Sequence, residues 1–185
     1  MTDSGISDIY NYRAVDDALA TSGQPTVAQL GGIARAGFST IINLALHDDP
    51  RYSLPDEAGS VRSLGLAYVH IPVPFAAPAP AELLALFAAM EAHRGEKVWV
   101  HCAANMRVSV FLGLYRVLRL GWQREPAFAL MRDLWKPQCT VVLVYRHHAR
   151  AAGLKNICQT ARIMLPKWTT KHAGQAPARV APGRY

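Results

Sequence analysis

Residues 97–116, KVWVHCAANMRVSVFLGLYR, join an apolar β-branched run to a run with helical spacing through a short loop. The first run predicts a buried strand and the second a helix, so Cys102 ends the strand just before the helix N-terminus. Backbone N–H groups converge at such a position and the helix dipole makes it positive, which favours a thiolate and binds an anion. Arg107, five residues after the cysteine, can direct a two-pronged guanidinium at two oxygens of an oxyanion.

Cys102 has two interpretations. Free cysteine is among the most buried residue types, and a structural thiol would need no particular neighbours. A core thiol does not need the asparagine, arginine and serine that stand at Asn105, Arg107 and Ser109, so we favour a nucleophile. Ser109, in the first helical turn, can donate a hydrogen bond to the sulfur when an intermediate is hydrolysed. His101 is expected to orient the loop.

The rest of the chain alternates strand and helix signals at short intervals. This alternation predicts an α/β fold, a single layered domain with a central, mostly parallel sheet flanked by helices, whose ligands bind at the carboxyl ends of the strands. Strands are predicted at 38–46, 66–75 and 97–102, and none before residue 38. Helices are predicted at 27–36 with Thr26 as N-cap, from residue 56 to Gly65, from Pro80 to Gly95, at 108–121 and at 125–134, and we favour a closing helix over a strand for 138–152.

The length of 185 residues suits one domain, which we place at 1–154. Residues 155–185 form a basic C-terminal tail that is expected to be partly disordered, and much of the net charge of +7 arises near this end because Asp133 is the last acidic residue. Few aromatic residues accompany these charges, so no nucleic-acid partner is expected. No apolar run approaches the ~18 residues of a membrane span, and the N-terminus lacks a signal-like pattern, so we expect a cytoplasmic protein without a membrane partner.

Three cysteines without CxxC spacing predict neither a disulfide framework nor a zinc site, and we expect no metal and no other cofactor. Adjacent histidines at 147–148 cannot share one helical face, which argues against paired metal ligation.

The loop VHCAANMRVS resembles that of the tyrosine phosphatase superfamily, which reads His-Cys, five residues, Arg, then Ser or Thr. The resemblance extends from about Tyr12 to Leu154, and YNYRAVDDALATSGQPT, NLAL and HIPV look like a bacterial branch of dual-specificity-type phosphatases. It implies a tyrosine/dual-specificity-phosphatase-like fold in which Cys102 forms a phosphocysteine intermediate, with Ser109 at the family's hydroxyl position and His101 at its histidine. The phosphate would be bound by the loop residues Ala103, Ala104, Asn105, Met106 and Arg107.

The sequence departs from the superfamily pattern twice. The Cys-to-Arg loop is one residue short, which places Asn105 at the family's glycine position, and this short HC-x-x-N-x-R-x-S form resembles the bacterial branch. The aspartate that serves as general acid is missing, because Pro74 or Phe75 occupies its place. His47, Asp48 and Asp49 are the possible substitutes, although a solvated turn is the favoured interpretation of all three.

We therefore predict a cysteine-dependent phosphatase of the tyrosine or dual-specificity type, which hydrolyses phosphate monoesters such as phosphotyrosine and whose turnover is expected to be slow. Its partner would be a phosphorylated protein, a small phosphoester or another oxyanion. Two alternatives stay open. A Cys-to-Arg loop of six residues also resembles rhodanese-like sulfurtransferases, which carry a cysteine persulfide, and the missing acid favours a weakly active pseudophosphatase that only binds phosphorylated ligands. The sequence does not indicate the oligomeric state.

Overall fold

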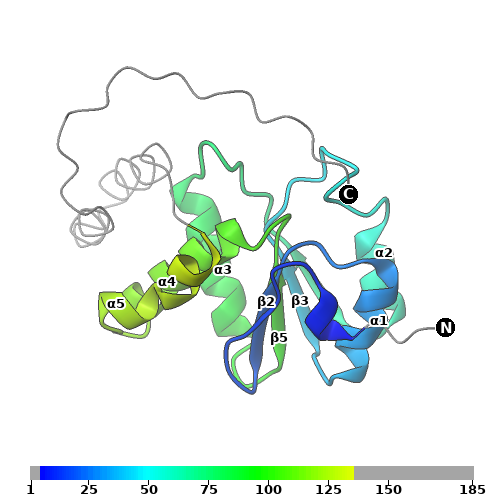
Figure 1. Cartoon of the computed structure of the whole chain (residues 1–185), viewed down its shortest axis with the longest axis horizontal. Helices are drawn as coiled ribbons and strands as arrows, with labels where there is room; N and C mark the ends of the chain where they lie inside the picture. The colour runs from blue at the N-terminus through cyan, green and yellow to red at the C-terminus, as the bar shows by residue number, and fades with distance from the viewer. Residues whose placement is uncertain (1–4, 136–185) are drawn as a thin grey trace.

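A computed structural model describes residues 5–135 of the chain (Figure 1). The predicted helix at 138–152 and the basic tail at 155–185 lie outside the described residues. The strands are β1 (Arg13–Ala14), β2 (Leu19–Ser22), β3 (Thr40–Asn43), β4 (Ala67–His70) and β5 (Val98–His101). The helices are η1 (Ile6–Asp8, a 3₁₀ helix), α1 (Val27–Arg35), α2 (Glu57–Ser63), α3 (Pro80–Ala92), α4 (Met106–Leu118), α5 (Arg124–Ala127) and α6 (Ala129–Leu134).

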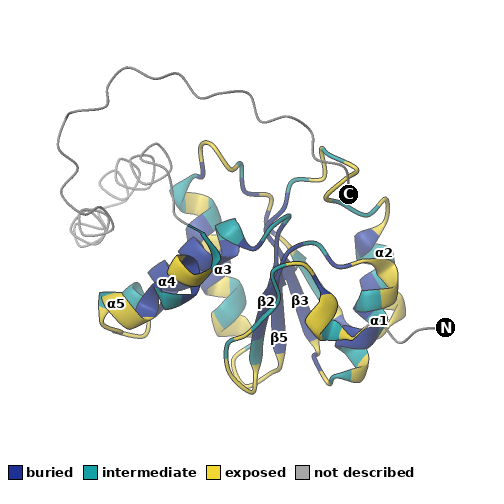
Figure 2. Cartoon of the chain, in the orientation of Figure 1, coloured by how far each residue is buried: buried dark blue, intermediate teal, exposed yellow. Residues whose placement is uncertain are grey.

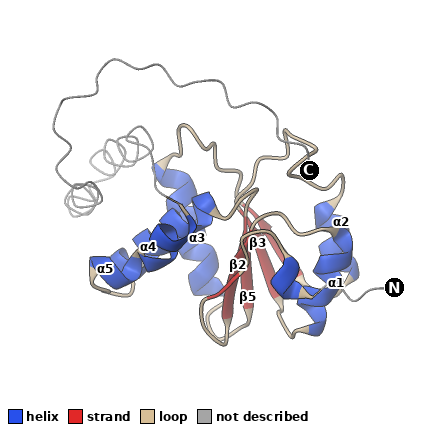
Figure 3. Ribbon diagram, in the orientation of Figure 1, coloured by secondary structure: helices blue, strands red, loops and turns tan. Residues whose placement is uncertain are grey.

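The five strands form one sheet in the order β1-β2-β5-β3-β4. β2, β5, β3 and β4 run parallel, and β1 pairs antiparallel with β2. Figures 1 and 3 show α1 and α2 on one side of the sheet and α3, α4 and α5 on the other. The predicted single-domain α/β architecture with a mostly parallel sheet is therefore confirmed.

The core consists of two apolar layers, one on each face of the sheet (Figure 2). Successive strand residues point to opposite faces, so Ile41 and Trp99 pack toward α1 and α2, whereas Ile42 and Val100 pack toward α3 and α4. Thr26 caps α1 as predicted, because its side chain accepts the N–H of Gln29. Both faces of the central strands are buried, which explains their continuous apolar runs.

Several predicted ends are shifted, since β3 is Thr40–Asn43 rather than 38–46 and α4 is Met106–Leu118 rather than 108–121, and three differences are larger. The hairpin of β1 and β2 was not predicted, and the predicted strand 66–75 ends at His70, before Pro72 and Pro74. The predicted helix 125–134 is divided into α5 and α6 at Phe128, whose ring packs where a Cβ on Gly113 of α4 would lie.

The parallel register places polar residues in one row at the carboxyl ends of the central strands. Ser22 of β2 and Asn43 of β3 both lie opposite His101 of β5, and Asn43 also lies opposite His70 of β4. Cys102 follows this row directly. The sheet thus places the predicted loop at its carboxyl edge, where parallel α/β sheets bind ligands.

Candidate active site

The loop between β5 and α4 is short, and it closes through Asn105. Cys102 is 1% exposed, and α4 begins at Met106 with Asn105 as its N-cap residue. Asn105 has φ +62°, in the left-handed region that asparagine tolerates better than most residues. Its buried side chain donates to Asn11 O at 2.8 Å and to Thr21 Oγ1 at 2.9 Å. Asparagine thus takes the turn that a glycine would take and also ties the loop to the N-terminal segment.

Two carbonyl groups of the loop accept hydrogen bonds from the N-terminal segment of the chain. Ala103 O accepts the Gln24 N–H at 3.2 Å, and Ala104 O accepts Asn11 Nδ2 at 3.1 Å. Gly23 permits this close approach, because a Cβ there would lie 2.9 Å from Ala103 O. The C=O and N–H of one trans peptide point in opposite directions, so the N–H of Ala104 turns away from Gln24.

Four of the predicted backbone donors remain available. Within residues 5–135 no acceptor takes the N–H groups of Ala103, Ala104, Met106 or Arg107. Unpaired N–H groups at the start of a helix bind an anion together with the helix dipole. The loop beside Cys102 is therefore suited to an oxyanion.

Arg107 is fixed through one of its three guanidinium nitrogens. Nη1 donates to Leu44 O at 3.0 Å and to Val73 O at 2.9 Å, in the segments that follow β3 and β4. Nε and Nη2 donate to no acceptor among the described residues, which leaves one edge of the planar group for a ligand. That edge has the geometry that binds two oxygens at once.

Ser109 is fully buried in the first turn of α4. Its hydroxyl donates to Met106 O at 2.8 Å and accepts the indole N–H of Trp135 at 3.1 Å. The hydroxyl proton is thus directed at Met106 O rather than at the sulfur of Cys102 in this structure. The Trp135 ring also lies 6.0 Å from that of Phe75, which comes from the segment where the general acid was sought.

His101 lies against a buried carboxylate that sequence reasoning did not identify. Its Nε2 is 2.7 Å from Oε1 of Glu57, and both side chains are fully buried. Neither of these two atoms has a hydrogen-bond partner of suitable geometry, so we describe the approach as a close polar contact. The other carboxylate oxygen accepts Asn43 Nδ2 at 2.9 Å and lies 3.6 Å from His47 Nε2. The carboxylate of Glu57, at the start of α2, thus holds His101, the residue that is predicted to orient the loop.

Opposing effects act on the pKa of Glu57. Burial raises it, but the contact with His101, together with Gln24 and the charge of His47, outweighs burial and holds the pKa below its ordinary value. The carboxylate is therefore ionised at neutral pH.

Glu57→Gln is expected to lower the free energy of unfolding by about 2–4 kcal/mol at neutral pH, because it leaves His101 without its carboxylate. The pKa of Glu57 is lower in the folded chain than its ordinary value of 4.5, so the ionised carboxylate stabilises the fold above pH 4.5. That contribution is lost as the pH falls through the folded-state pKa. Urea unfolding at neutral pH and at about pH 3 should therefore show a difference between variant and wild type that shrinks in acid.

Glu91→Gln is the matched control, because Glu91 is exposed on α3 and its ion pair with Arg119, at 3.5 Å, is also exposed to solvent. It should leave the unfolding midpoint almost unchanged. An equal loss for Glu57→Gln at both pH values would contradict the assignment of an ionised Glu57.

The substitute acids lie in the loop after β3, and neither is buried. Asp48 is exposed, and Asp49 forms an ion pair with Arg51 whose closest atoms are 2.6 Å apart. Hydrogen bonds from Arg51 hold the pKa of Asp49 below its ordinary value, which disfavours this carboxyl as a proton donor at neutral pH. His47 stacks on His70, with ring centroids 4.2 Å apart.

Residues 5–135 contain neither a membrane-spanning helix nor a metal-binding cluster of side chains. No helix there has both the length and the apolar character that a bilayer crossing requires. No cluster of three or more histidine, cysteine or acidic side chains in the same residues is arranged to hold a metal ion.

Comparison with known proteins gives matches over most of the described residues. The family profile described as the phosphatase-like domain of beta-lactamase hydrolase-like protein matches residues 11–118. Beta-lactamase hydrolase-like proteins of two Xylella fastidiosa strains are 31% identical over 118 residues, which are 63% of this chain and 27% of theirs. The chain thus spans about a quarter of the length of these curated relatives.

Solved structures share the fold. A candidate phosphatase of the DUF442 group from Shewanella putrefaciens CN-32 is 27% identical, with a TM-score of 0.68 over 79% of this chain and 95% of its own. Tk-PTP in its active form is 22% identical, with a TM-score of 0.62 over 76% and 97% of the two chains. TpbA of P. aeruginosa in complex with pTyr is 18% identical, with a TM-score of 0.55 over 83% and 90%. The last two show the fold alone, so the predicted tyrosine/dual-specificity-phosphatase-like fold is confirmed, and the family profile confirms the resemblance to a phosphatase family.

Proposed function

Because the chain belongs to the family of beta-lactamase hydrolase-like phosphatase-like domains, we propose that it hydrolyses phosphate monoesters through a phosphocysteine intermediate on Cys102. The observation that carries this proposal is the arrangement around the cysteine. Arg107 is anchored through Nη1 with Nε and Nη2 left for a ligand, and the backbone N–H groups of the same loop, next to Cys102 in sequence, have no acceptor in residues 5–135.

The reaction has two steps. The sulfur of Cys102 attacks phosphorus, the bond to the ester oxygen breaks, and the phosphoryl group is transferred to the sulfur. Water then attacks the phosphocysteine, which releases inorganic phosphate and restores the thiolate. Arg107 and the loop N–H groups stabilise the three phosphoryl oxygens in both steps. The proposed role of Ser109, a hydrogen bond to the leaving sulfur, requires its hydroxyl to turn from Met106 O.

The leaving oxygen needs a proton or must be stable as an anion. No acidic residue stands between Ile71 and Pro80, so the family's usual donor is missing from that segment. A phenolate leaves more readily without a proton than an alkoxide does. We therefore propose aryl phosphates, including phosphotyrosine, as the favoured substrate class.

A second candidate function is rhodanese-like sulfur transfer. The observation in its favour is the short loop, in which only residues 103–106 separate Cys102 from Arg107. A persulfide on Cys102 would be formed from thiosulfate with release of sulfite and would pass its outer sulfur to cyanide or a thiol. That reaction needs no acid for an ester oxygen.

Parallel assays of the purified chain with p-nitrophenyl phosphate and with thiosulfate plus cyanide distinguish these functions. We expect phosphate release that exceeds thiocyanate formation and that disappears in Cys102→Ser. Thiocyanate as the main product would assign the site to sulfur transfer. Tight binding of phosphate with neither product would instead indicate a pseudophosphatase.

A further inference from the structure

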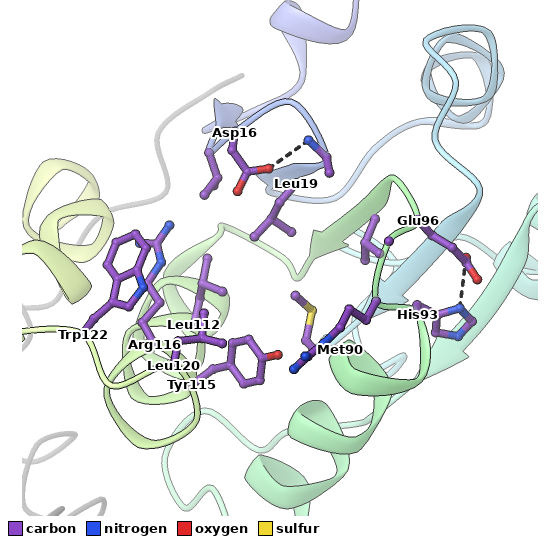
Figure 4. A pocket seen from close by; sticks show the side chains of 15 residues that line it. Asp16, Leu19, Met90, His93, Glu96, Leu112, Tyr115, Arg116, Leu120 and Trp122 are labelled. Carbon is purple, nitrogen blue, oxygen red and sulfur yellow. Dashed lines mark hydrogen bonds and ion pairs between the residues drawn. The ribbon is translucent and has the colours of Figure 1, made fainter.

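A separate pocket of about 500 Å³ lies at the other end of the central strands from Cys102 (Figure 4). Leu19 at the start of β2 and Val98 at the start of β5 line it, together with the C-terminal part of α3. The same helix α4 that begins beside Cys102 contributes Leu112, Tyr115 and Arg116. None of the loop residues 102–107 belongs to this pocket.

Most of the pocket wall is apolar. Leu19, Met90, Val98 and Leu112 come from four different elements, and Figure 4 shows Leu19, Met90 and Leu112 around the same space. Its volume lies within the range of small-molecule sites. Such sites combine an apolar wall with a few polar groups that fix the ligand.

Arg116 supplies a buried cation. The residue is 9% exposed, its guanidinium carbon lies 4.7 Å from the centre of the Trp122 ring, and Nη1 donates to Ala127 O at 3.4 Å. Among the described residues no carboxylate lies within 4.0 Å of it; Asp16 lines the same pocket, but its carboxylate accepts the N–H of Ala18. Burial lowers the pKa of Arg116, and the more distant charge of Asp16 offsets only part of this effect. A buried guanidinium without a close anion is costly.

Tyr115 supplies a hydroxyl. The residue is 6% exposed, and its hydroxyl forms no hydrogen bond with any described residue. Figure 4 shows this hydroxyl directed toward the middle of the pocket. The hydroxyl oxygen itself is not fully shielded, so it is open to a hydrogen bond with a ligand atom in the pocket.

We propose that this pocket binds a small molecule with one carboxylate on an apolar body, the carboxylate contacting Arg116 and the body packing on Leu19, Met90 and Leu112. The anion supplies the charge that the chain does not place within 4.0 Å of Arg116, and Tyr115 donates a second hydrogen bond to the ligand. The proposal does not depend on the phosphatase activity.

Calorimetric titration of the full chain with 4-phenylbutyrate and with 4-phenylbutan-1-ol tests it, because the two probes differ only in the charged group. We expect saturable binding of the carboxylate with one site per chain. The alcohol should bind at least about 10-fold more weakly than the carboxylate, as the loss of one charge-assisted hydrogen bond implies. Excess inorganic phosphate should leave this binding unchanged, because the proposed phosphate site at the Cys102 loop shares no residue with this pocket. No saturable binding, or equal affinity for both probes, would overturn the proposal, as would competition by phosphate.

Variants locate the site. Arg116→Gln is expected to weaken phenylbutyrate binding about 10-fold or more, and Tyr115→Phe, which keeps the ring, about 3-fold or more. Arg119→Gln is the matched control, because Arg119 is exposed, does not line the pocket and should leave binding unchanged. If Arg116→Gln does not fold, Tyr115→Phe and the two wild-type titrations decide. Undiminished binding in both pocket variants would refute the assignment.

Discussion

Cys102→Ser is expected to reduce hydrolysis of p-nitrophenyl phosphate by at least about 10⁴-fold. A serine hydroxyl is a weak nucleophile unless an adjacent base activates it, and no side chain in residues 5–135 forms a hydrogen bond with the free Cys102 side chain. The change replaces one small buried atom by another, so the free energy of unfolding should move by less than about 1 kcal/mol. The variant should also still bind phosphate, because Arg107 and the loop N–H groups are retained.

Phosphate release, a urea unfolding curve and a phosphate titration measure these three quantities on one preparation. Cys139→Ser and Cys158→Ser make the same chemical change outside the loop and should keep wild-type turnover. If Cys102→Ser lost several kcal/mol of stability but kept the phosphatase activity of the wild type, Cys102 would be a structural thiol instead.

The fold could largely be predicted because its central strands have strong local signals. The runs around β3 and β5 are apolar and β-branched, since both of their faces are buried, and the turn residues between them are conspicuous. The β2 strand gives no such signal. Leu19–Ser22 is four residues long with two hydroxyl side chains, and it becomes a strand because β5 pairs with it in parallel.

The candidate site could be predicted only as far as it is contiguous in sequence. Cys102, Asn105 and Arg107 lie in one segment, so their spacing alone indicates an anion site. Glu57 precedes the histidine that it contacts by more than 40 residues and has the appearance of an ordinary acid in the first turn of a helix. The hydrogen bond from Trp135 to Ser109 also joins residues far apart in sequence, so no local pattern indicates it.

The same contacts explain how a loop that is one residue short keeps the arginine in place. Asn105 takes the left-handed turn, so α4 begins at Met106 and Arg107 is its second residue. The carbonyls of Leu44 and Val73 then fix one nitrogen of the guanidinium. Shortening the loop therefore need not misdirect the side chain, because segments after two neighbouring strands orient it independently of the loop.

Arg107→Lys is expected to lower kcat/KM for p-nitrophenyl phosphate by about 10²–10³-fold, the usual loss for one oxyanion donor. An ammonium group can replace Nη1 at Leu44 O or Val73 O, but it then has no planar edge that binds two phosphoryl oxygens. Phosphate affinity should fall as well, because the fork contacts the bound ion and the transition state alike.

Steady-state kinetics and a phosphate titration measure both effects, and the urea midpoint shows whether the fold is kept. Arg132→Lys is the control, since Arg132 is exposed on α6 and should retain wild-type kinetics. If Arg107→Lys lost less than about 10-fold in kcat/KM, the backbone N–H groups alone would bind the phosphoryl oxygens. The guanidinium would then serve chiefly to hold the segments after β3 and β4, and its replacement should appear as a lower urea midpoint rather than a lower rate.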